Sequence, residues 1–275
     1  MVEQITVTLP DGSRKEAEAG MKISDFVKEK IGAGLAKAAV FARVDGEDQD
    51  LARPLTHDSK LEVFTHRSPE ALEVVRHDAA HVVASVVQRL FPGTQVTIGP
   101  SIEDGFYYDF DFSGGPSPKE ADLEKLQASM EEMLPSWTTM TGTEASEKDA
   151  RDRFNQNPYK LELIDGIVEN NDTITLYTSG GFTDLCRGGH SEQPSRDLKK
   201  GSFVLDRLAG AYWRGDEKNP MLTRIYGLAF DTKEELATYQ EQQEEAKKRD
   251  HRKLGKELDL FTFSDLVGPG MPLFT

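Results

Sequence analysis

The sequence lacks several features that would assign the chain to a specialised class. It has one cysteine, Cys186, in 275 residues. A single cysteine rules out an internal disulfide framework and favours a reducing, cytoplasmic environment. No apolar run reaches the roughly 18 residues of a membrane span, and the first residues enter a strand pattern directly. We therefore expect no membrane partner and no signal or transit peptide.

Positive charge is also scarce. Lys and Arg number 33 against 48 Asp and Glu, which gives a net charge of −15. Phosphate binding depends on Lys and Arg, so this balance argues against a general nucleic-acid binder. The basic residues nevertheless gather at two places, of which the first is most simply a solvated helix face. The first cluster comprises Lys247, Lys248, Arg249, His251, Arg252 and Lys253, and the looser second one Arg196, Lys199, Lys200, Arg207 and Arg214.

The composition that remains is that of a folded protein. Hydrophobic residues make up 37% and charged residues 29%, and the length suffices for two domains. Residues 1–65 alternate like strands on either side of Pro10–Ser13, a turn sequence, and Ser24 can cap a short helix. Strands at 40–44 and 61–64 follow. This order predicts a β-grasp, ubiquitin-like fold with a binding or spacer role.

Residues 66–230 predict a larger α+β domain with a mainly antiparallel sheet. Ser68 and Pro69 start a helix that reaches about Leu90, and Ser117 with Glu120 suggests a capping box for a helix to Met133. The expected buried stripe of the first helix is Leu72, Val75, Ala79, Val82 and Val86. We expect further helices at 146–155 and 158–167, and strands at 95–99, 137–141, 173–178, 182–186, 202–213 and 222–230.

A long polar helix is predicted over 231–258, starting at Asp231. A helix that is polar all round usually connects domains. Residues 259–275 begin new apolar structure and end abruptly at Thr275. The sequence therefore predicts that the chain is part of a longer protein.

Two histidines stand out on the first long helix. His77 and His81 are four residues apart, so their rings project from one face. Helical metal sites use this spacing, but the glutamate of the zinc-protease motif is missing. Taken alone, the pair fits two ordinary helix histidines as well as a site.

A matching pair follows a predicted strand near the end of the larger domain. Cys186 and His190 are also four residues apart, with Gly188 and Gly189 between them. A lone cysteine is usually a small buried apolar residue, and His190 alone would be a loop histidine. The repetition of the spacing favours one shared site.

Other residues could complete such a site. Gly99 and Tyr108, with Phe106 and Tyr107, place aromatic faces beside glycine-rich backbone, which suits a nucleobase or ribose. A buried aromatic core is an equal alternative for Phe106 and Tyr107. Lys160 could stabilise a developing oxyanion, or be an ordinary helix lysine.

Six motifs in order then reveal a family resemblance. They are RHDAAH (76–81), IGPSIEDGFYYDFD (98–111), DLCRGGH (184–190), AGAYWRGD (209–216), RIYGLAF (224–230) and KKRDHRKLGKELDLF (247–261). The chain resembles threonyl-tRNA synthetase over essentially its whole length. The resemblance implies a TGS module at 1–65, a tRNA-editing domain at 66–230, a linker helix at 231–258 and the start of the class II catalytic domain at 259–275.

The resemblance also implies residue roles. His77, His81, Cys186 and His190 would line the pocket where serine is cut from the tRNA 3′ adenosine. Asp184 and Lys160 would bind the seryl group and order the attacking water, and Tyr108 and Gly99 would contact the adenosine or its sugar. One departure is Gly188-Gly189, where many members carry Gly-Pro.

The implied activity is hydrolysis of seryl-tRNA made for threonine, with the tRNA acceptor end as partner and no metal in the pocket. Serine lacks one methyl of threonine, worth only about 1–3 kcal/mol of discrimination, so a second site must remove the wrong product. Two alternatives remain: a zinc-dependent deacylase that uses all four His and Cys residues, and a non-catalytic tRNA-docking module. ATP, magnesium, zinc, ligation and homodimer formation are expected of the catalytic domain beyond Thr275, so this chain should not charge tRNA.

Overall fold

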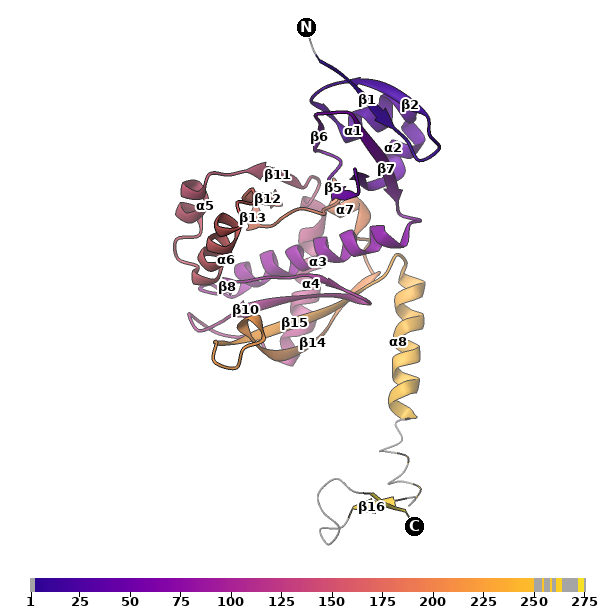
Figure 1. Ribbon diagram of the computed structural model, residues 1–275. Coiled ribbons are helices and arrows are strands. Elements are labelled where there is room, and N and C mark those ends of the chain that lie inside the picture. The colour runs from indigo at the N-terminus through magenta and orange to yellow at the C-terminus, as the bar shows by residue number, and fades with distance from the viewer. Residues whose placement is uncertain (1–2, 250–253, 255–257, 259–260, 264–271, 275) are drawn as a thin grey trace.

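The computed structural model describes residues 3–249, 254, 258, 261–263 and 272–274. An amino-terminal domain (β1 to β7) is followed by a larger domain (α3 to β15), and helix α8 extends away from it (Figure 1). Both domains combine helices with mainly antiparallel strands, which confirms the predicted α+β class.

The amino-terminal domain is a β-grasp. Its sheet has the order β2-β1-β7-β4-β5, in which β1 is parallel to β7 and the other pairs are antiparallel. Ile5 and Val7 of β1 point into the core, as their alternation predicts. The sheet strands are β1 (Gln4–Thr8), β2 (Arg14–Glu18), β4 (Ala39–Val44), β5 (Glu47–Gln49) and β7 (Ser59–Thr65), and β3 (Met21–Lys22) pairs with β6 (Pro54–Leu55).

The helical segment of this domain starts earlier than predicted. Helix α1 (Ile23–Phe26) has Lys22 at its capping position, so Ser24 lies within the first turn and does not cap it. A π-helical turn (Val27–Ile31) and α2 (Ala33–Ala38) follow. Ile23 and Phe26 are both buried in the core of this domain.

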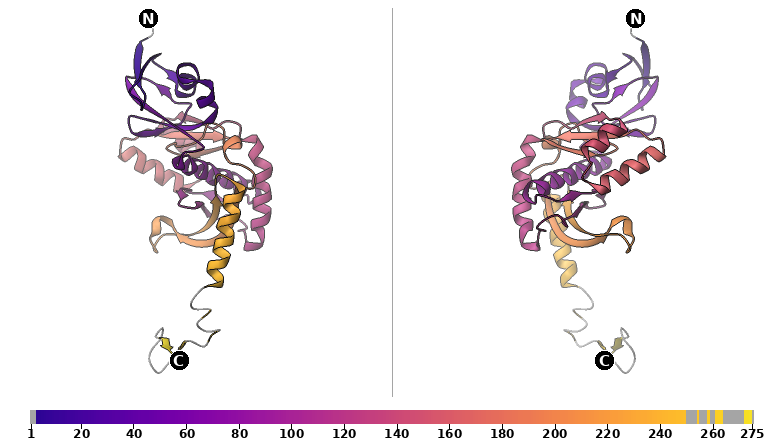
Figure 2. Two further views of the ribbon diagram at one scale, coloured as in Figure 1. Left: turned by 90° about the vertical axis from the view of Figure 1, so that its right-hand side faces the viewer. Right: turned by 90° about the vertical axis from the view of Figure 1, so that its left-hand side faces the viewer.

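The larger domain is arranged around helix α3 (Pro69–Leu90). Figure 1 shows α3 between a five-stranded sheet and a smaller three-stranded sheet, and Figure 2 shows the same layers from the sides. The larger sheet has the order β14-β15-β10-β8, with β9 also on β10, and the smaller one is β11-β12-β13. The strands are β8 (Gln95–Val96), β9 (Ser101–Ile102), β10 (Gly105–Asp111), β11 (Thr141–Glu144), β12 (Thr175–Ser179), β13 (Phe182–Leu185), β14 (Phe203–Tyr212) and β15 (Met221–Ala229).

Helix α3 is buried on nearly all sides, not only along the predicted stripe. Except for His77, every residue from Val74 to Val87 is buried, whereas Leu72 is only partly so. The helix therefore needs alanine and valine on all sides, since other layers approach it closely. His81 and Asp78 are buried among them.

Other boundaries also differ from prediction. Helix α4 (Leu123–Met133) follows a single 3-10 turn in which Asp122 Oδ2 accepts a hydrogen bond from the Lys119 backbone N–H at 2.8 Å, so Ser117 and Glu120 form no capping box. Strand β11 begins at Thr141, and Trp137, which we placed in a strand, ends a 3-10 turn in the core. The remaining helices are α5 (Glu147–Arg153), α6 (Pro158–Glu169) and α7 (Pro194–Asp197).

Helix α8 (Lys233–Lys248) begins two residues after the predicted start. Thr232 caps it and forms a capping box with Glu235. Only Leu236 of this helix is buried, in keeping with its polar sequence. The described helix ends at Lys248, and residues 250–253, 255–257 and 259–260 of the predicted linker and its sequel lie outside the described part. Further on, β16 (Phe261–Phe263) pairs with β17 (Pro272–Phe274).

The two domains pack on each other through an apolar contact. Phe41 and Phe64 stack with centroids 4.5 Å apart and form a core cluster with Val40, Ala71 and Val74. Around this contact, Arg196 Nη2 donates to Ala39 O at 2.8 Å. The amino-terminal domain is thus fixed against the start of α3.

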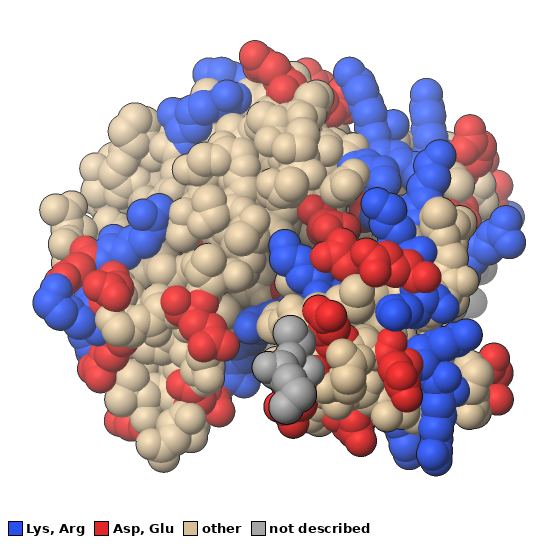
Figure 3. Space-filling view, turned by 90° about the horizontal axis from the view of Figure 1, so that it is seen from above, with Lys and Arg blue, Asp and Glu red and all other residues tan. Residues whose placement is uncertain are grey.

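Most of the described residues in the two predicted basic clusters are paired with carboxylates. The five residues of the second cluster each meet a carboxylate: Asp197, Asp231, Glu131, Asp206 and Glu162. In the first, Lys247 and Arg249 pair with Glu244 and Glu245, and 251–253 lie outside the described residues. Seen from above, charges of both signs are interspersed (Figure 3).

Candidate functional site

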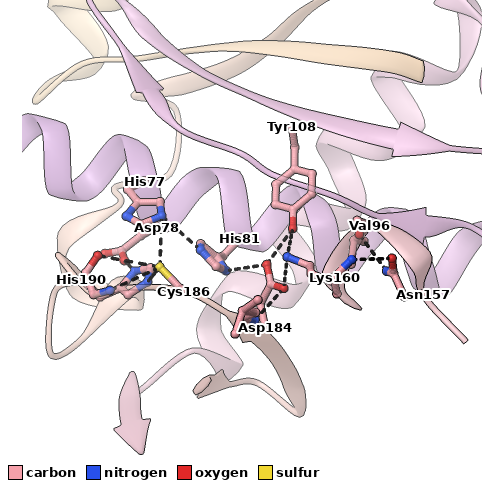
Figure 4. Close-up of polar contacts among 12 residues, drawn as sticks. His77, Asp78, His81, Val96, Tyr108, Asn157, Lys160, Asp184, Cys186 and His190 are labelled. Atoms are coloured by element: carbon pink, nitrogen blue, oxygen red, sulfur yellow. Dashed lines mark hydrogen bonds and ion pairs between the residues drawn. The ribbon is translucent and has the colours of Figure 1, made fainter. Parts of the chain in front are cut away.

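Every residue that the sequence assigned to the site lies in one region of the larger domain, as the close-up in Figure 4 shows for all but Gly99. Apart from Gly99, which lies between β8 and β9, four separate parts of the chain supply them. The contributors are His77 and His81 of α3, Tyr108 of β10, Lys160 of α6, and Asp184, Cys186 and His190 of β13 and its following loop.

The four His and Cys side chains form one cluster. Their possible ligand atoms all lie within 4.8 Å of one another. His81 Nε2 is 3.2 Å from His77 Nε2, and His190 Nε2 is 3.2 Å from Cys186 Sγ. The His77 ring stacks on the His190 ring with centroids 4.3 Å apart. The two i, i+4 pairs therefore do face each other.

Charge coupling within this cluster is strong. Burial alone would raise the pKa of the Cys186 thiol, but His190 and His77 hold that pKa well below its usual value. Burial would likewise lower the pKa of His190, but Cys186 and Asp78 raise it well above its usual value. The arrangement favours a thiolate beside an imidazolium. His81 differs, because burial lowers its pKa and keeps its ring neutral.

Asp184 is the centre of a second, fully buried cluster. Its Oδ1 lies 2.5 Å from Lys160 Nζ and also accepts a hydrogen bond from the backbone N–H of Leu185 at 2.8 Å. Its Oδ2 accepts a hydrogen bond from the Tyr108 hydroxyl at 2.6 Å and lies 3.5 Å from His81 Nδ1. His81 is therefore the residue that joins the two clusters.

The start of α6 fixes the position of Lys160. Asn157 caps this helix by accepting from the Lys160 backbone N–H at 3.1 Å, while its Nδ2 donates to Val96 O at 2.8 Å. Pro158 occupies the first helical position. Capping thus anchors the first turn to the sheet side of the domain and directs the Lys160 ammonium to Asp184.

Gly99 and Tyr108 are in direct contact. A Cβ added to Gly99 would lie 2.1 Å from the Tyr108 ring, so only glycine permits this packing. Burial raises the pKa of Tyr108 well above its usual value, and its hydroxyl is engaged with Asp184. Phe106 is buried in the core, which is the alternative given for it above. Tyr107 instead stacks with Arg224, whose Cζ lies 3.7 Å from the centroid of the Tyr107 ring.

Only His77 and Cys186 give the clusters an exposed side. Both are partly exposed, whereas His81, Lys160, Asp184 and His190 are each at most 3% exposed. A reactant from solvent would therefore meet the imidazole of His77 and the sulfur of Cys186 before the buried polar groups.

Sequence reasoning missed two carboxylates that hold His190. Asp78 is fully buried, and its carboxylate lies 2.8 Å from His190 Nδ1 and 3.3 Å from the Ser191 backbone N–H. Asp50, in the amino-terminal domain, accepts a hydrogen bond from the His190 backbone N–H at 2.7 Å. An aspartate next to His77 within an apolar helix was an available signal for Asp78. Nothing in the sequence pointed to Asp50.

The His and Cys donors also have separations compatible with a metal ion. Tetrahedral zinc with ligands at 2.0–2.3 Å brings neighbouring donor atoms to about 3.3–3.8 Å. Cys186 Sγ lies 3.6 Å from His77 Nε2, and two other donor pairs are 3.2 Å apart. These donor distances are therefore compatible with the zinc-dependent alternative.

Comparison with known proteins matches one domain model and several relatives. Residues 5–65 match the TGS domain model. The chain is 53% identical over 278 residues to the threonine--tRNA ligase of Myxococcus xanthus (strain DK1622), which covers 100% of this chain and 42% of that protein. Identity to the threonine--tRNA ligase of Staphylococcus aureus (strain JH9) is 44% over 273 residues, 99% of this chain and 41% of that protein.

The chain therefore carries a TGS domain, and the β-grasp fold of residues 5–65 agrees with that match. More particularly, the chain is homologous along its whole length to the amino-terminal part of threonine--tRNA ligases. It spans about two fifths of the length of these relatives. Among the described residues, no helix is long and apolar enough to cross a membrane.

Proposed function

We propose that this chain hydrolyses seryl-tRNA made for threonine, at the site formed by α3, β13 and the loop that follows β13. The residue roles are those that the resemblance implies, and the tRNA acceptor end is the partner. The observation that carries the proposal is the buried Lys160–Asp184 pair beside the His and Cys cluster.

Stability alone gives little reason to keep such a pair. Burying two charges costs several kcal/mol per ion before their attraction offsets that cost. A pair of apolar residues in the same place often gives equal or greater stability. Here the pair is also bonded to Tyr108 and adjoins His81. Buried charged groups in contact with titratable groups are common at catalytic sites.

The proposed reaction needs a positioned water and stabilisation of the tetrahedral oxyanion. His77 and Cys186, on the partly exposed side, receive the aminoacyl ester. The seryl group extends toward Asp184 and Lys160, where the carboxylate binds its amino group and the ammonium stabilises negative charge. Ester hydrolysis then proceeds without a covalent bond to the enzyme: water adds to the carbonyl carbon and loses a proton, the bond from that carbon to the ribose oxygen breaks, and the ribose oxygen takes up a proton.

The test uses the chain itself. It is incubated with seryl-tRNA and, separately, threonyl-tRNA, both on the tRNA for threonine, and release of the amino acid is followed with time. We expect serine release well above the spontaneous rate and threonine release close to it. Asp184→Asn should abolish the difference, and exposed Asp152→Asn is the matched control. Serine release at the spontaneous rate, at concentrations where binding is demonstrated, would contradict the proposal and favour a docking module.

The donor geometry supports a second candidate, a zinc-dependent deacylase. His77, His81, Cys186 and His190 would hold the ion, whose chemistry would be activation of the attacking water. A closed shell of four ligands leaves no position for that water unless one ligand stays free. We therefore favour the metal-free reaction. We propose the use of ATP and magnesium, and the ligation reaction, only for a whole ligase that includes the catalytic domain.

A further inference from the structure

Asp50 lies in the amino-terminal domain, but both hydrogen bonds that its side chain accepts come from the larger domain. Its Oδ1 accepts from the His190 backbone N–H at 2.7 Å, and its Oδ2 accepts from the Tyr177 hydroxyl. Asp50 is only 7% exposed. A carboxylate that bonds an N–H and a hydroxyl away from water makes strong, charge-assisted bonds.

The loop between Cys186 and His190 depends on such side-chain contacts. It contains no helix or strand, and the Gly188 N–H points to Cys186 Sγ at 3.5 Å. Further along, the His190 backbone N–H donates a hydrogen bond to Asp50, and the Ser191 backbone N–H donates one to Asp78. Because regular structure does not hold the loop, these carboxylates set the path of its backbone.

The Asp50–Tyr177 pair also shapes this path directly. A Cβ on Gly188 would lie 2.7 Å from the Tyr177 hydroxyl and 3.5 Å from Asp50 Oδ2. Gly188 has φ +113°, and Gly189 has φ +79°, which proline cannot adopt. The Tyr177 ring packs against the His190 ring, with centroids 4.6 Å apart. The loop therefore packs against Tyr177 of the larger domain and Asp50 of the amino-terminal domain.

We propose that Asp50 is a positioning residue for deacylation, through which the amino-terminal domain holds His190 in place beside Cys186. This inference rests on the function proposed above. Asp50 does not touch the reacting atoms. It acts on the backbone of a residue whose ring nitrogen lies 3.2 Å from Cys186 Sγ. A displacement of about 1 Å in such a group can slow a reaction about 100-fold.

Four variants of the chain separate positioning from general stability. Asp50→Ala removes both bonds and leaves a buried amide unsatisfied. Asp50→Asn keeps an oxygen for the His190 N–H, and Tyr177→Phe removes only the second bond. Glu47→Ala is the matched control, since Glu47 is an exposed acidic residue three positions earlier. Thermal unfolding of each variant establishes whether it is folded at the assay temperature.

The rate of serine release is measured against enzyme concentration under single-turnover conditions. For Asp50→Ala we expect the maximal rate to fall about 10- to 100-fold, with little change in the concentration at half-maximal rate. Asp50→Asn should recover most of the loss, Tyr177→Phe should lie between, and Glu47→Ala should match the wild type. If Asp50→Ala does not fold, Tyr177→Phe decides the question, and a rate and a loop exchange both within twofold of the wild type would overturn the inference.

Amide hydrogen exchange of the peptide covering 186–191 provides a readout that needs no activity. Exchange there should accelerate in Asp50→Ala and stay at the wild-type rate in Glu47→Ala. A folded Asp50→Ala whose maximal rate and exchange both stay within twofold of the wild type would overturn the inference. A wild-type chain that releases no serine would instead overturn the proposed function, and the exchange result would still decide whether Asp50 holds the loop.

Discussion

The ammonium of Lys160 lies 2.5 Å from Asp184 Oδ1, and neither side chain is more than 2% exposed. The two residues come from α6 and β13. Tyr108 bonds the second carboxylate oxygen, so each charge has a partner. This relationship links the stability of the domain to its proposed chemistry.

Breaking the pair on one side should be costly. Lys160→Met leaves the Asp184 carboxylate buried without its cation, and we expect a loss of about 3–5 kcal/mol in the free energy of unfolding. The double variant Lys160→Met with Asp184→Asn should recover part of this loss, since no buried charge remains unpaired. Urea unfolding of both variants measures the effect. A single variant as stable as the wild type would show that water or another group solvates Asp184.

Cys186, as the only cysteine of the chain, gives a direct measure of the cluster's electrostatics. The pKa of its thiol is lowered, so the reactive thiolate should persist as the pH falls below the usual thiol value of about 8.5. The rate of alkylation by iodoacetamide should therefore have its midpoint well below pH 8.5. His190→Ala should move the midpoint upward, and exposed His57→Ala should not. A wild-type midpoint near pH 8.5 would contradict the coupling.

Asp78 should matter through His190. Asp78→Asn keeps the size of the side chain but removes the charge facing His190 Nδ1 at 2.8 Å. We expect the pKa of His190, followed by NMR of its ring, to fall, because Asp78 contributes to raising it. Serine release should slow about tenfold or more. An unchanged His190 titration would assign Asp78 a role only at the Ser191 amide.

The sequence was most informative where one local pattern determines one element. The alternation in β1 and the proline at the start of α3 located those elements, and the repeated i, i+4 spacing predicted that His77, His81, Cys186 and His190 would meet. Helix starts were wrong in two places: Lys22 rather than Ser24 precedes α1, and Lys119 with Asp122 rather than Ser117 with Glu120 begins the turn before α4. Strand β10 was not predicted as a strand, since its aromatic residues fit a core or a ligand site equally well. Asp50 was unpredictable, because its contacts join positions 140 residues apart.

Zinc content decides between the two proposed mechanisms. Protein purified without chelator should contain far less than one zinc per chain, and EDTA should leave serine release unchanged. The physical reason is that the buried ammonium of Lys160 lies close behind the cluster and disfavours a divalent cation. Stoichiometric zinc, with activity that is lost on its removal and restored on its return, would establish the zinc-dependent alternative.

The exposed side of the site offers the most direct test of catalysis. His77 and Cys186 are the partly exposed members of the cluster, so truncating either should disturb the core less than truncating fully buried Val82 or Val86. We expect His77→Ala and Cys186→Ala each to slow serine release about 100-fold, the scale of a misplaced ester, while unfolding free energies change by less than about 1.5 kcal/mol. Val82→Ala, by contrast, should lower stability and leave the single-turnover rate of the folded fraction near that of the wild type. Release rates are measured with tRNA at saturation, which separates lost chemistry from lost binding. If both pocket variants release serine as fast as the wild type, the His and Cys cluster is not the hydrolytic site.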